Sequence, residues 1–587
     1  MNAKELKKLY LDFFKSKMHA VIPSASLIPA NDASVLFNTA GMQPLAPYFS
    51  GTPHPLGQRL VNLQKCLRTV DFENIGDDTH HTFFQMLGNW SLGDYFKKEA
   101  IEWSFEFLTS KKWLHLPLKD LAVTVYQGDK AVPRDEESHA LWRTQGLPEA
   151  RLAFMGKDNF WIAGETGPCG PSTEMFYWTG EGKAPVSFDP ADNRWVEIWN
   201  DVFMAYFKKD DGSVIHLKQK NVDTGMGLER TLAILNGKKN AYETDLFLPI
   251  IKTIETLSGK KYAQETRAMR IIADHIRASV FILGDEHAVL PSNVDRGYIL
   301  RRLIRRIVRY GKMIGINTLF TERLAEEVVR TYAETYPELE LNQERILVGL
   351  HKEEEKFERT LEKGLKEYEK MAQRGNISGK DAFLLFQSYG FPLEMTEEMA
   401  DEKKIEVDTE GFLKEYAEHQ KLSRSGAEKK FKGGLADLSP DVIKMHTATH
   451  ILNEALRKVI SKDIYQRGSN ITPERLRFDF SFGRKLMPEE IKRVEDEVNR
   501  VITADYKVTR KEMPRSEAEK LDAQKEFGQK YPEKVSVYFV GDYSKEFCGG
   551  PHVAHTKEIG HFQIIKEESV AAGVRRIKAM VREQQRR

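Results

Sequence analysis

Residues 221–230, Asn-Val-Asp-Thr-Gly-Met-Gly-Leu-Glu-Arg, restrict how this chain can fold more than any other stretch. Two glycines and a small hydroxyl side chain at its centre let backbone approach a ligand closely. Asp223 and Arg230 stand towards its ends. A carboxylate can hold an ammonium group, and a guanidinium can grip a phosphate with a planar fork of donors. The stretch is consistent with one pocket for a nucleotide and an amino acid; an ordinary tight turn is the alternative.

The bulk composition describes a globular chain of several domains. With 587 residues the chain is too long for one core, and usual domain sizes predict roughly three to five domains. The net charge is +1, so any surface for nucleic acid must be local. Three cysteines argue against a disulfide scaffold and favour a reducing compartment.

Membrane and secretory classes are not supported. No apolar run approaches the roughly 18 residues of a membrane span. The first residues include an early acid and no apolar segment of a signal peptide. We therefore expect a cytoplasmic protein with no membrane partner.

The first 240 residues alternate short apolar runs with turn residues. Residues 62–99 predict a hairpin with charges at its mouth, and Arg68 lies on its first segment. Residues 158–178 are dense in Gly and Pro, which predicts a shaped loop; Trp161 beside it can wall a small pocket. Residues 197–207 predict a buried strand.

From about residue 245 the pattern becomes helical. Positions 300, 303, 304, 307 and 308 form an apolar stripe, and five arginines fill the other face: Arg301, Arg302, Arg305, Arg306 and Arg309. Such a cluster is a possible footprint for a phosphate backbone. A solvated or salt-bridged face is an equally supported alternative. Residues 343–370 predict a long charged helix, and residues 425–438 a linker.

A second set of chemically active residues lies near the C-terminus. His446 and His450 are spaced i and i+4, on one face of a helix predicted to run to about residue 460. Cys548 and His552 follow about a hundred residues later, around a tight turn. These four side chains have the right type and number for a tetrahedral zinc site. The alternative is two core histidines and an unrelated buried cysteine.

Taken together, these segments resemble the alanyl-tRNA synthetases, which are class II aminoacyl-tRNA synthetases. The resemblance covers essentially residues 1–580. It is most specific at residues 222–230, 167–171 and 87–96 and at the His446/His450/Cys548/His552 set. It implies an α/β multidomain (α+β) fold. Its parts would be a class II antiparallel sheet with flanking helices in residues 1–240, a helical tRNA-recognition domain with linker in 241–435, and an α+β zinc-containing editing domain in 436–587.

The resemblance also implies an activity, the ATP-dependent attachment of L-alanine to tRNA(Ala) through an alanyl-adenylate. By similarity, Arg68 would contact the α-phosphate of ATP and Arg230 the outer phosphates, with Mg2+ bridging, while Asp223 would hold the alanine ammonium. These steps need positioning and charge neutralisation more than covalent help. Further residues implied for the ATP and alanine pockets are Asp71, Met86, Trp161, Asn200 and Gly225.

A second, hydrolytic activity is implied at the zinc set. A pocket for a methyl group discriminates against serine or glycine by only about 1–3 kcal/mol, roughly 10–200-fold. Hydrolysis of Ser-tRNA(Ala) and Gly-tRNA(Ala) would supply the rest. The resemblance places Gln466 and Ser469 near this editing site and makes Zn2+ its cofactor.

Three features depart from the family pattern. The loop between Arg68 and Asp71 is shorter than the common form. The family reads the G3:U70 pair of the acceptor stem with an Asn and an Asp; Asn293 matches the first, but Gln387 stands where the Asp is expected, and Gln can both donate and accept hydrogen bonds. The sequence also ends after the editing region, so we expect a monomer. Other residues expected to contact tRNA are Arg301 and Arg305.

Three rival functions remain open. A free-standing editing deacylase would not need residues 1–240. An inactive paralogue that only binds tRNA is opposed by the presence of Arg68, Asp223 and Arg230. A class II synthetase for another amino acid is the third; threonyl enzymes carry a similar His/Cys set, but the catalytic motifs here resemble the alanyl pattern.

Overall fold

The computed structural model divides into two units, residues 1–412 (unit 1) and residues 413–587 (unit 2). It describes residues 1–29, 35–69, 72–164, 166–430, 439–472, 475–521, 523–524, 533–571 and 574–582. None of the helices within these ranges is long and apolar enough to cross a membrane.

Unit 1 is built on a nine-stranded sheet. Its strands are β1 (Ala20–Val21), β2 (Arg59–Leu67), β3 (Phe83–Leu92), β4 (Leu121–Tyr126), β5 (Leu152–Met155), β6 (Phe160–Ile162), β7 (Gly167–Trp178), β8 (Trp195–Lys208) and β9 (Val214–Gly227). The order is β1-β2-β3-β9-β8-β7-β4-β5, and β6 pairs with β7. All pairs are antiparallel except β1·β2 and β4·β5. The predicted antiparallel sheet, the hairpin of residues 62–99 and the buried strand of residues 197–207 are confirmed.

The shaped loop predicted for residues 158–178 is wrong in part, because most of this segment is strand. Residues 167–178 form β7, with a register shift between Cys169 and Ser172 against β8. Gly170 explains the difference. A Cβ atom there would lie 1.9 Å from the carbonyl oxygen of Phe203 on β8, so glycine is needed for the two strands to approach this closely.

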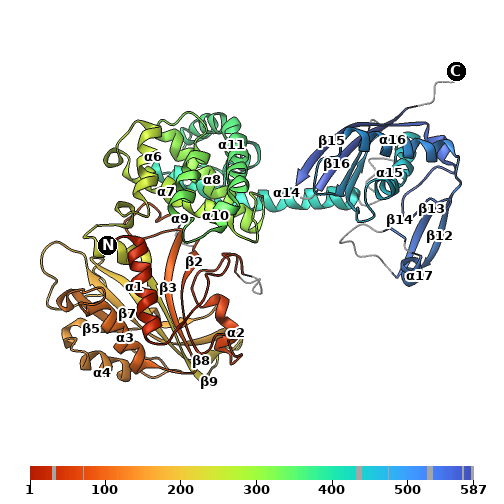
Figure 1. The fold of residues 1–587 in the computed structure, drawn as a ribbon. Helices are drawn as coiled ribbons and strands as arrows, with labels where there is room; N and C mark the ends of the chain where they lie inside the picture. The colour runs from red at the N-terminus through yellow and green to blue at the C-terminus, as the bar shows by residue number, and fades with distance from the viewer. Residues whose placement is uncertain are drawn as a thin grey trace. The chain divides into compact units, whose positions relative to one another are not determined.

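Helices flank the sheet and then dominate the chain after residue 245, as predicted (Figure 1). They are α1 (Ala3–Ser16), α2 (Ala46–Phe49), α3 (Lys97–Thr109), α4 (Glu136–Thr144), α5 (Leu228–Leu235), α6 (Leu248–Ser258), α7 (Thr266–Gly284), α8 (Asp295–Met313), α9 (Thr321–Tyr332), α10 (Glu338–Leu341), α11 (Gln343–Ala372), α12 (Gly379–Leu384), α13 (Leu393–Glu402) and α14 (Thr409–Lys430). The long charged helix predicted at residues 343–370 is α11. Of the predicted linker, residues 425–430 continue α14 and residues 431–438 lie outside the described ranges.

A buried ion pair fastens the helices of unit 1 to its sheet. Arg277 on α7 is fully buried, and its Nη1 lies 3.1 Å from Glu229 Oε1 on α5. Glu229 Oε2 also accepts a hydrogen bond of 3.0 Å from the backbone nitrogen of Gln85 on β3. Arg277 donates through Nη2 to the carbonyl oxygen of Phe83 on the same strand. Two charges in the interior thus satisfy each other and hold α5, α7 and β3 together.

Unit 2 combines two small antiparallel sheets with helices that follow α14 in the chain. Its strands are β10 (Gln466–Ile471), β11 (Leu476–Ser481), β12 (Val508–Pro514), β13 (Lys534–Val540), β14 (Ser544–Phe547), β15 (His561–Ala571) and β16 (Val574–Arg582); its helices are α15 (Pro440–Val459), α16 (Pro488–Thr503) and α17 (Arg515–Lys520). One sheet has the order β10-β11-β16-β15 and the other β12-β13-β14.

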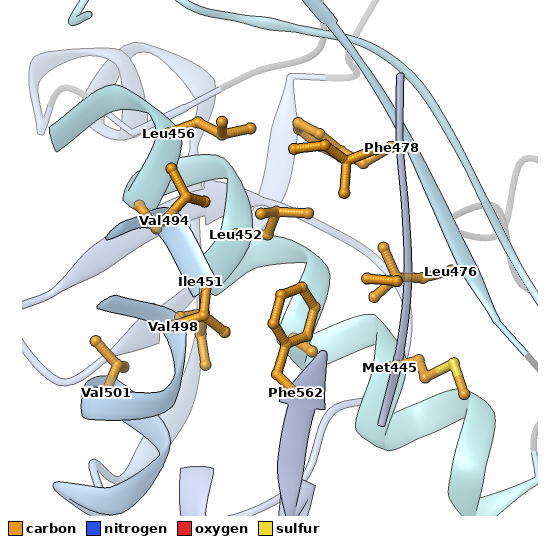
Figure 2. Close-up of a cluster of buried hydrophobic side chains, with 14 of the residues drawn as sticks. Met445, Ile451, Leu452, Leu456, Leu476, Phe478, Val494, Val498, Val501 and Phe562 are labelled. Carbon is orange, nitrogen blue, oxygen red and sulfur yellow. The ribbon is translucent and has the colours of Figure 1, made fainter. Parts of the chain in front are cut away.

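Helix α15 has two chemically different sides. Figure 2 shows its apolar side chains packed among those of α16, β11 and β15; the labelled members are Met445, Ile451, Leu452, Leu456, Leu476, Phe478, Val494, Val498, Val501 and Phe562. Positions 446, 450 and 453 follow a different line of the helix, at spacings of four and three. Packing of the apolar side fixes the rotation of α15 about its axis, and this in turn fixes the direction in which His446, His450 and Asn453 point.

The Arg277–Glu229 pair should be essential for the stability of unit 1. Glu229→Ala leaves the Arg277 guanidinium buried without its counter-charge, and we expect the free energy of unfolding to fall by about 3–5 kcal/mol. All eight tryptophans lie within residues 90–199, so urea unfolding followed by tryptophan fluorescence reports on unit 1. Glu355→Gln is the control; Glu355 is in an exposed pair with Arg359, and we expect a loss no greater than about 0.5 kcal/mol. Equal stability of both variants would contradict this role.

Candidate functional site

Asp223 lies at the middle of the large sheet, on β9. It faces Trp90 on β3 and Val202 on β8. Its Oδ1 accepts a hydrogen bond of 2.7 Å from Trp90 Nε1. The side chain is buried, and this burial raises the pKa of Asp223 to about 7, although the Trp90 hydrogen bond acts to lower it. A buried carboxylate whose described partner is one neutral donor is suited to receive a cation.

Glycines shape the surface beside Asp223. Gly225 follows Asp223 at the next position on the same face of β9. A Cβ atom at Gly225 would lie 2.8 Å from Met86 Sδ, and one at Gly88 would lie 2.5 Å from the ring of Trp90. The two glycines therefore give the side chains of Met86 and Trp90 room to lie against the backbone of the sheet.

The predicted alanine-pocket residues adjoin this surface. Asn200 on β8 faces Gly225 in the strand register, and its Nδ2 donates to Glu174 Oε1 at 3.2 Å. Trp161 on β6 packs against the apolar cluster that contains Trp90. The structure therefore brings together three of the predicted residues, Trp161, Asn200 and Gly225, near Asp223.

Two predicted arginines lie on the same sheet system. Arg68 follows β2, is exposed, and holds its guanidinium 4.9 Å from the ring centre of Phe84. Phe84 alternates with Met86 along β3 and so shares its face. Arg230 lies in the first turn of α5, directly after the end of β9, with Nη1 3.3 Å from Glu197 Oε2. The predicted residue Asp71 lies outside the described ranges.

Sequence reasoning missed an acidic group next to these residues. Glu174 is inside β7; burial, followed by the charges of Glu197 and Asp158, raises its pKa to about 8. Trp90, the partner of Asp223, was also not singled out. For Glu174, the available signal was an acidic residue next to the apolar residues of a strand. For Trp90, it was a tryptophan inside residues 87–96, one of the segments most similar to the family.

The five arginines of α8 are paired with acids within unit 1. The nitrogen–oxygen distances are 2.6–3.4 Å; the pairs are Arg301–Glu353, Arg305–Glu353, Arg302–Glu394, Arg306–Glu398, Arg309–Glu398 and Arg309–Glu402. The structure therefore contains the salt-bridged alternative rather than an open basic face. Contacts of Arg301 and Arg305 with tRNA stay a prediction, and they would require these buried pairs to open.

The same network contacts Asn293, one of the two residues predicted to read the acceptor stem, and Gly390, which lies close in sequence to the other. Arg301 donates to Oδ1 of Asn293, which is exposed just before α8. Arg305 donates to the carbonyl oxygen of Gly390, three residues after Gln387 on the π-helical turn η7 (Leu385–Tyr389). Because Glu353 on α11 pairs with both arginines, one buried carboxylate ties together two segments that lie 94 residues apart.

In unit 2, the four predicted metal ligands form one cluster. The ligand atoms of His446, His450, Cys548 and His552 all lie within 4.8 Å of one another. His446 Nε2 is 3.4 Å from Cys548 Sγ, whereas Nε2 of His450 and Nε2 of His552 are buried without a hydrogen-bond partner. A buried ring nitrogen without a hydrogen-bond partner is energetically costly unless another group, such as a metal ion, binds to it. Three nitrogens and one sulfur fit a tetrahedral metal ion.

The electrostatics of the cluster favour the ligand forms of Cys548 and His552; for His450, burial would lower the pKa, but the charges of Glu546 and Cys548 raise it to about 10. Burial by itself would raise the pKa of the Cys548 thiol, but the charge of His450 and the closeness of all three histidine side chains lower it to about 2. Burial lowers the pKa of His552 to about 3. A thiolate and a neutral imidazole are the forms that bind a metal.

The predicted editing residues lie on another element of unit 2. Gln466 and Ser469 are both on β10, and Gln466 Nε2 donates to Ser469 Oγ at 3.3 Å. The cluster of His446, His450, Cys548 and His552 is formed by α15 and by the residues that follow β14. The structure thus brings Gln466 and Ser469 to each other on the four-stranded sheet.

Comparison with known proteins places the chain in a family. The family model "tRNA synthetases class II (A)" matches residues 5–465, and "Threonyl and Alanyl tRNA synthetase second additional domain" matches residues 535–578. The alanine–tRNA ligase of Treponema pallidum is 50% identical over 594 residues, covering 99% of this chain and 98% of that protein. That of Treponema denticola is 52% identical over 590 residues, covering 98% of each.

A more distant relative is longer than this chain. The alanine–tRNA ligase of Bacillus subtilis is 37% identical over 707 residues, covering 99% of this chain and 79% of that protein. The family matches span both units, including the sheet with Asp223 and the segment with Cys548 and His552. The chain belongs to the alanine–tRNA ligases, the alanyl-tRNA synthetase family of class II.

Proposed function

We propose that this enzyme attaches L-alanine to tRNA(Ala) through an alanyl-adenylate and hydrolyses mischarged Ser-tRNA(Ala) and Gly-tRNA(Ala). The observation that carries the first activity is the buried Asp223 carboxylate on a sheet face lined by Gly225, with Arg68 and Arg230 on neighbouring elements. In this assignment residues 1–240 catalyse aminoacylation, residues 241–435 bind tRNA, and residues 436–587 carry out editing.

In the aminoacylation pocket, Asp223 holds the ammonium group of alanine while Trp161 and Asn200 surround its methyl group. Arg68 neutralises the α-phosphate of ATP and Arg230 the outer phosphates. Mg2+ bound with ATP supplies further positive charge on the phosphate oxygens. Arg230 is paired with Glu197. When phosphate binds, the Arg230 guanidinium would exchange this part-exposed carboxylate for the more highly charged phosphate.

For editing, we propose that the His446/His450/Cys548/His552 cluster holds Zn2+. When bound, the ion supplies a fixed positive charge that can polarise an ester carbonyl or a water molecule. Gln466 and Ser469 offer polar side chains for the aminoacylated end of tRNA. The support is the convergence of four ligand atoms, two of them buried without a hydrogen-bond partner.

Alanine-dependent exchange between ATP and pyrophosphate tests the main proposal against its rivals. An editing deacylase and an inactive paralogue would give no exchange, and another synthetase would respond to another amino acid. Charging of an acceptor-stem minihelix then tests tRNA reading. We expect a G3:U70 minihelix to be charged and a G3:C70 minihelix not; equal charging would contradict the roles of Asn293 and Gln387.

The pKa of Asp223 predicts how alanine binding depends on pH. Only the carboxylate form attracts the ammonium group, and the pKa is about 7. The KM for alanine in the exchange reaction should therefore be lowest above pH 7 and should rise about tenfold per pH unit well below the pKa. Trp90→Phe removes the hydrogen bond that lowers this pKa, so the inflection should move to higher pH. The KM for ATP is the internal control, and a KM for alanine that is constant between about pH 6 and pH 8 would contradict the assignment.

Loss of the thiolate should separate the two proposed activities. Cys548→Ala removes one of four ligands, so we expect Ser-tRNA(Ala) to accumulate while alanine-dependent exchange stays unchanged. Discrimination against serine should then fall to that of the alanine pocket, about 10–200-fold. The measurement is charging of tRNA(Ala) with radiolabelled serine. Unchanged clearance of Ser-tRNA(Ala) would refute an editing role for this cluster.

A further inference from the structure

Each histidine of the metal cluster is held from behind through its Nδ1 atom. His446 Nδ1 lies 2.9 Å from the carbonyl oxygen of Pro551, and His450 Nδ1 contacts Glu546 Oε2. A carbonyl oxygen and an ionised carboxylate can each accept a hydrogen bond but cannot donate one. Both histidines therefore carry a proton on Nδ1, which leaves Nε2 as the ring nitrogen for a metal ion.

The third histidine is held in the same way by a hydroxyl group. Thr447 Oγ1 lies 3.1 Å from His552 Nδ1 and donates to the carbonyl oxygen of Ile443 at 3.2 Å. Because its one proton is used in that bond, the hydroxyl accepts from His552 Nδ1. All three imidazoles are thus oriented with Nε2 towards Cys548 before any ion binds.

Glu546 differs from the other partners because it is charged and is itself held in place. It is 4% exposed, and its Oε1 accepts a hydrogen bond of 2.9 Å from Asn453 Nδ2. The line of His446, His450 and Asn453 on α15 meets Glu546 and Cys548, which alternate on one side of β14 and its continuation. Side chains on one face of α15, spaced by three or four residues, therefore meet side chains on one face of the β14 segment, spaced by two.

The charge balance gives the carboxylate a second role. A divalent ion bound by three neutral imidazoles and one thiolate leaves one positive charge in a buried site. Such a charge is costly away from water unless it is paired. Glu546 supplies one negative charge next to a ligand, so the ion, the four ligands and this carboxylate are neutral together.

We propose that Glu546 is a positioning residue of the metal centre, which holds His450 in its ligating orientation and balances the charge of a bound divalent ion, with Asn453 fixing the carboxylate. This rests on the proposed metal site and goes beyond its four ligands. It assigns to Glu546 and Asn453 a contribution to metal affinity that does not depend on catalysis.

The experiment measures the affinity of the full-length chain for Zn2+ by competition with a chromophoric chelator. Glu546→Gln keeps the shape of the side chain and removes its charge; we expect affinity to fall about 10–100-fold. Glu546→Asp keeps the charge and shortens the reach, so it should also weaken binding. Co2+ is the spectroscopic probe, and its absorption bands should shift in both variants because the orientation of His450 changes.

The control is Glu454→Gln on α15, the helix that carries His450, with the same change of charge. Glu454 pairs with Lys458 and Arg457 at 3.6 and 3.7 Å. Burial raises the pKa of Glu454 and the charge of Glu546 adds to this, so Glu454 is electrostatically coupled to Glu546. We expect its affinity for Zn2+ to equal that of the wild type. Circular dichroism on all variants checks that unit 2 remains folded.

Three results would overturn the proposal. They are wild-type affinity in Glu546→Gln, wild-type affinity in Glu546→Asp, which would leave charge alone as the cause, and equal weakening in Glu454→Gln. A wild-type chain that binds neither Zn2+ nor Co2+ would instead refute the metal site itself, so the two failures can be told apart.

Discussion

The buried contact between Glu229 and Arg277 supports both the architecture of unit 1 and the position of its candidate site. Glu229 points inward to α7 and β3, while its neighbour Arg230 stands at the end of β9 beside Glu197. The carboxylate that anchors α5 therefore also sets the place of the guanidinium assigned to phosphate. Backbone groups of Phe83 and Gln85 and the hydroxyl of Tyr332 add hydrogen bonds that offset the cost of burying this charged pair.

Around that anchor, the large sheet holds several carboxylates that burial keeps from ionising easily. Burial raises the pKa of Asp201 to about 8 and that of Asp223 to about 7. Asp201 bonds to Ser104 on α3 at 2.7 Å, whereas Asp223 bonds to Trp90 on β3. Asp201 is thus tied to a flanking helix, whereas Asp223 is tied to a neighbouring strand and shares its face of β9 with Gly225. Under the proposed function, the first acid is structural and the second holds the ammonium group of alanine.

The sequence predicted best those features that depend on short spacing. The strands of residues 62–99, the helix with His446 and His450, and the long helix α11 all follow from periodicity within one element. The pairing of the α8 arginines could not be derived in this way, because Glu353 and Glu398 lie 48 and 92 residues from their partners. Residues 167–171 were also misread, since only the structure shows that the Phe203 carbonyl excludes a side chain at Gly170. Glycine at a close strand crossing and glycine in a loop look alike in sequence.

The ligands of unit 2 lie far apart in the chain, with contacts that span 102 and 105 residues. An ion held between α15 and the segment after β14 would therefore act as a cross-link that closes residues 446–552, more than half of this unit, into one loop. A covalent bridge closing a loop of about 100 residues is expected to remove roughly 4.7 kcal/mol of unfolded-chain entropy in simple polymer theory. A metal ion bound at this place would make the stability of unit 2 depend on the supply of free metal, so scarcity of the ion would lower the amount of folded protein as well as the proposed proofreading.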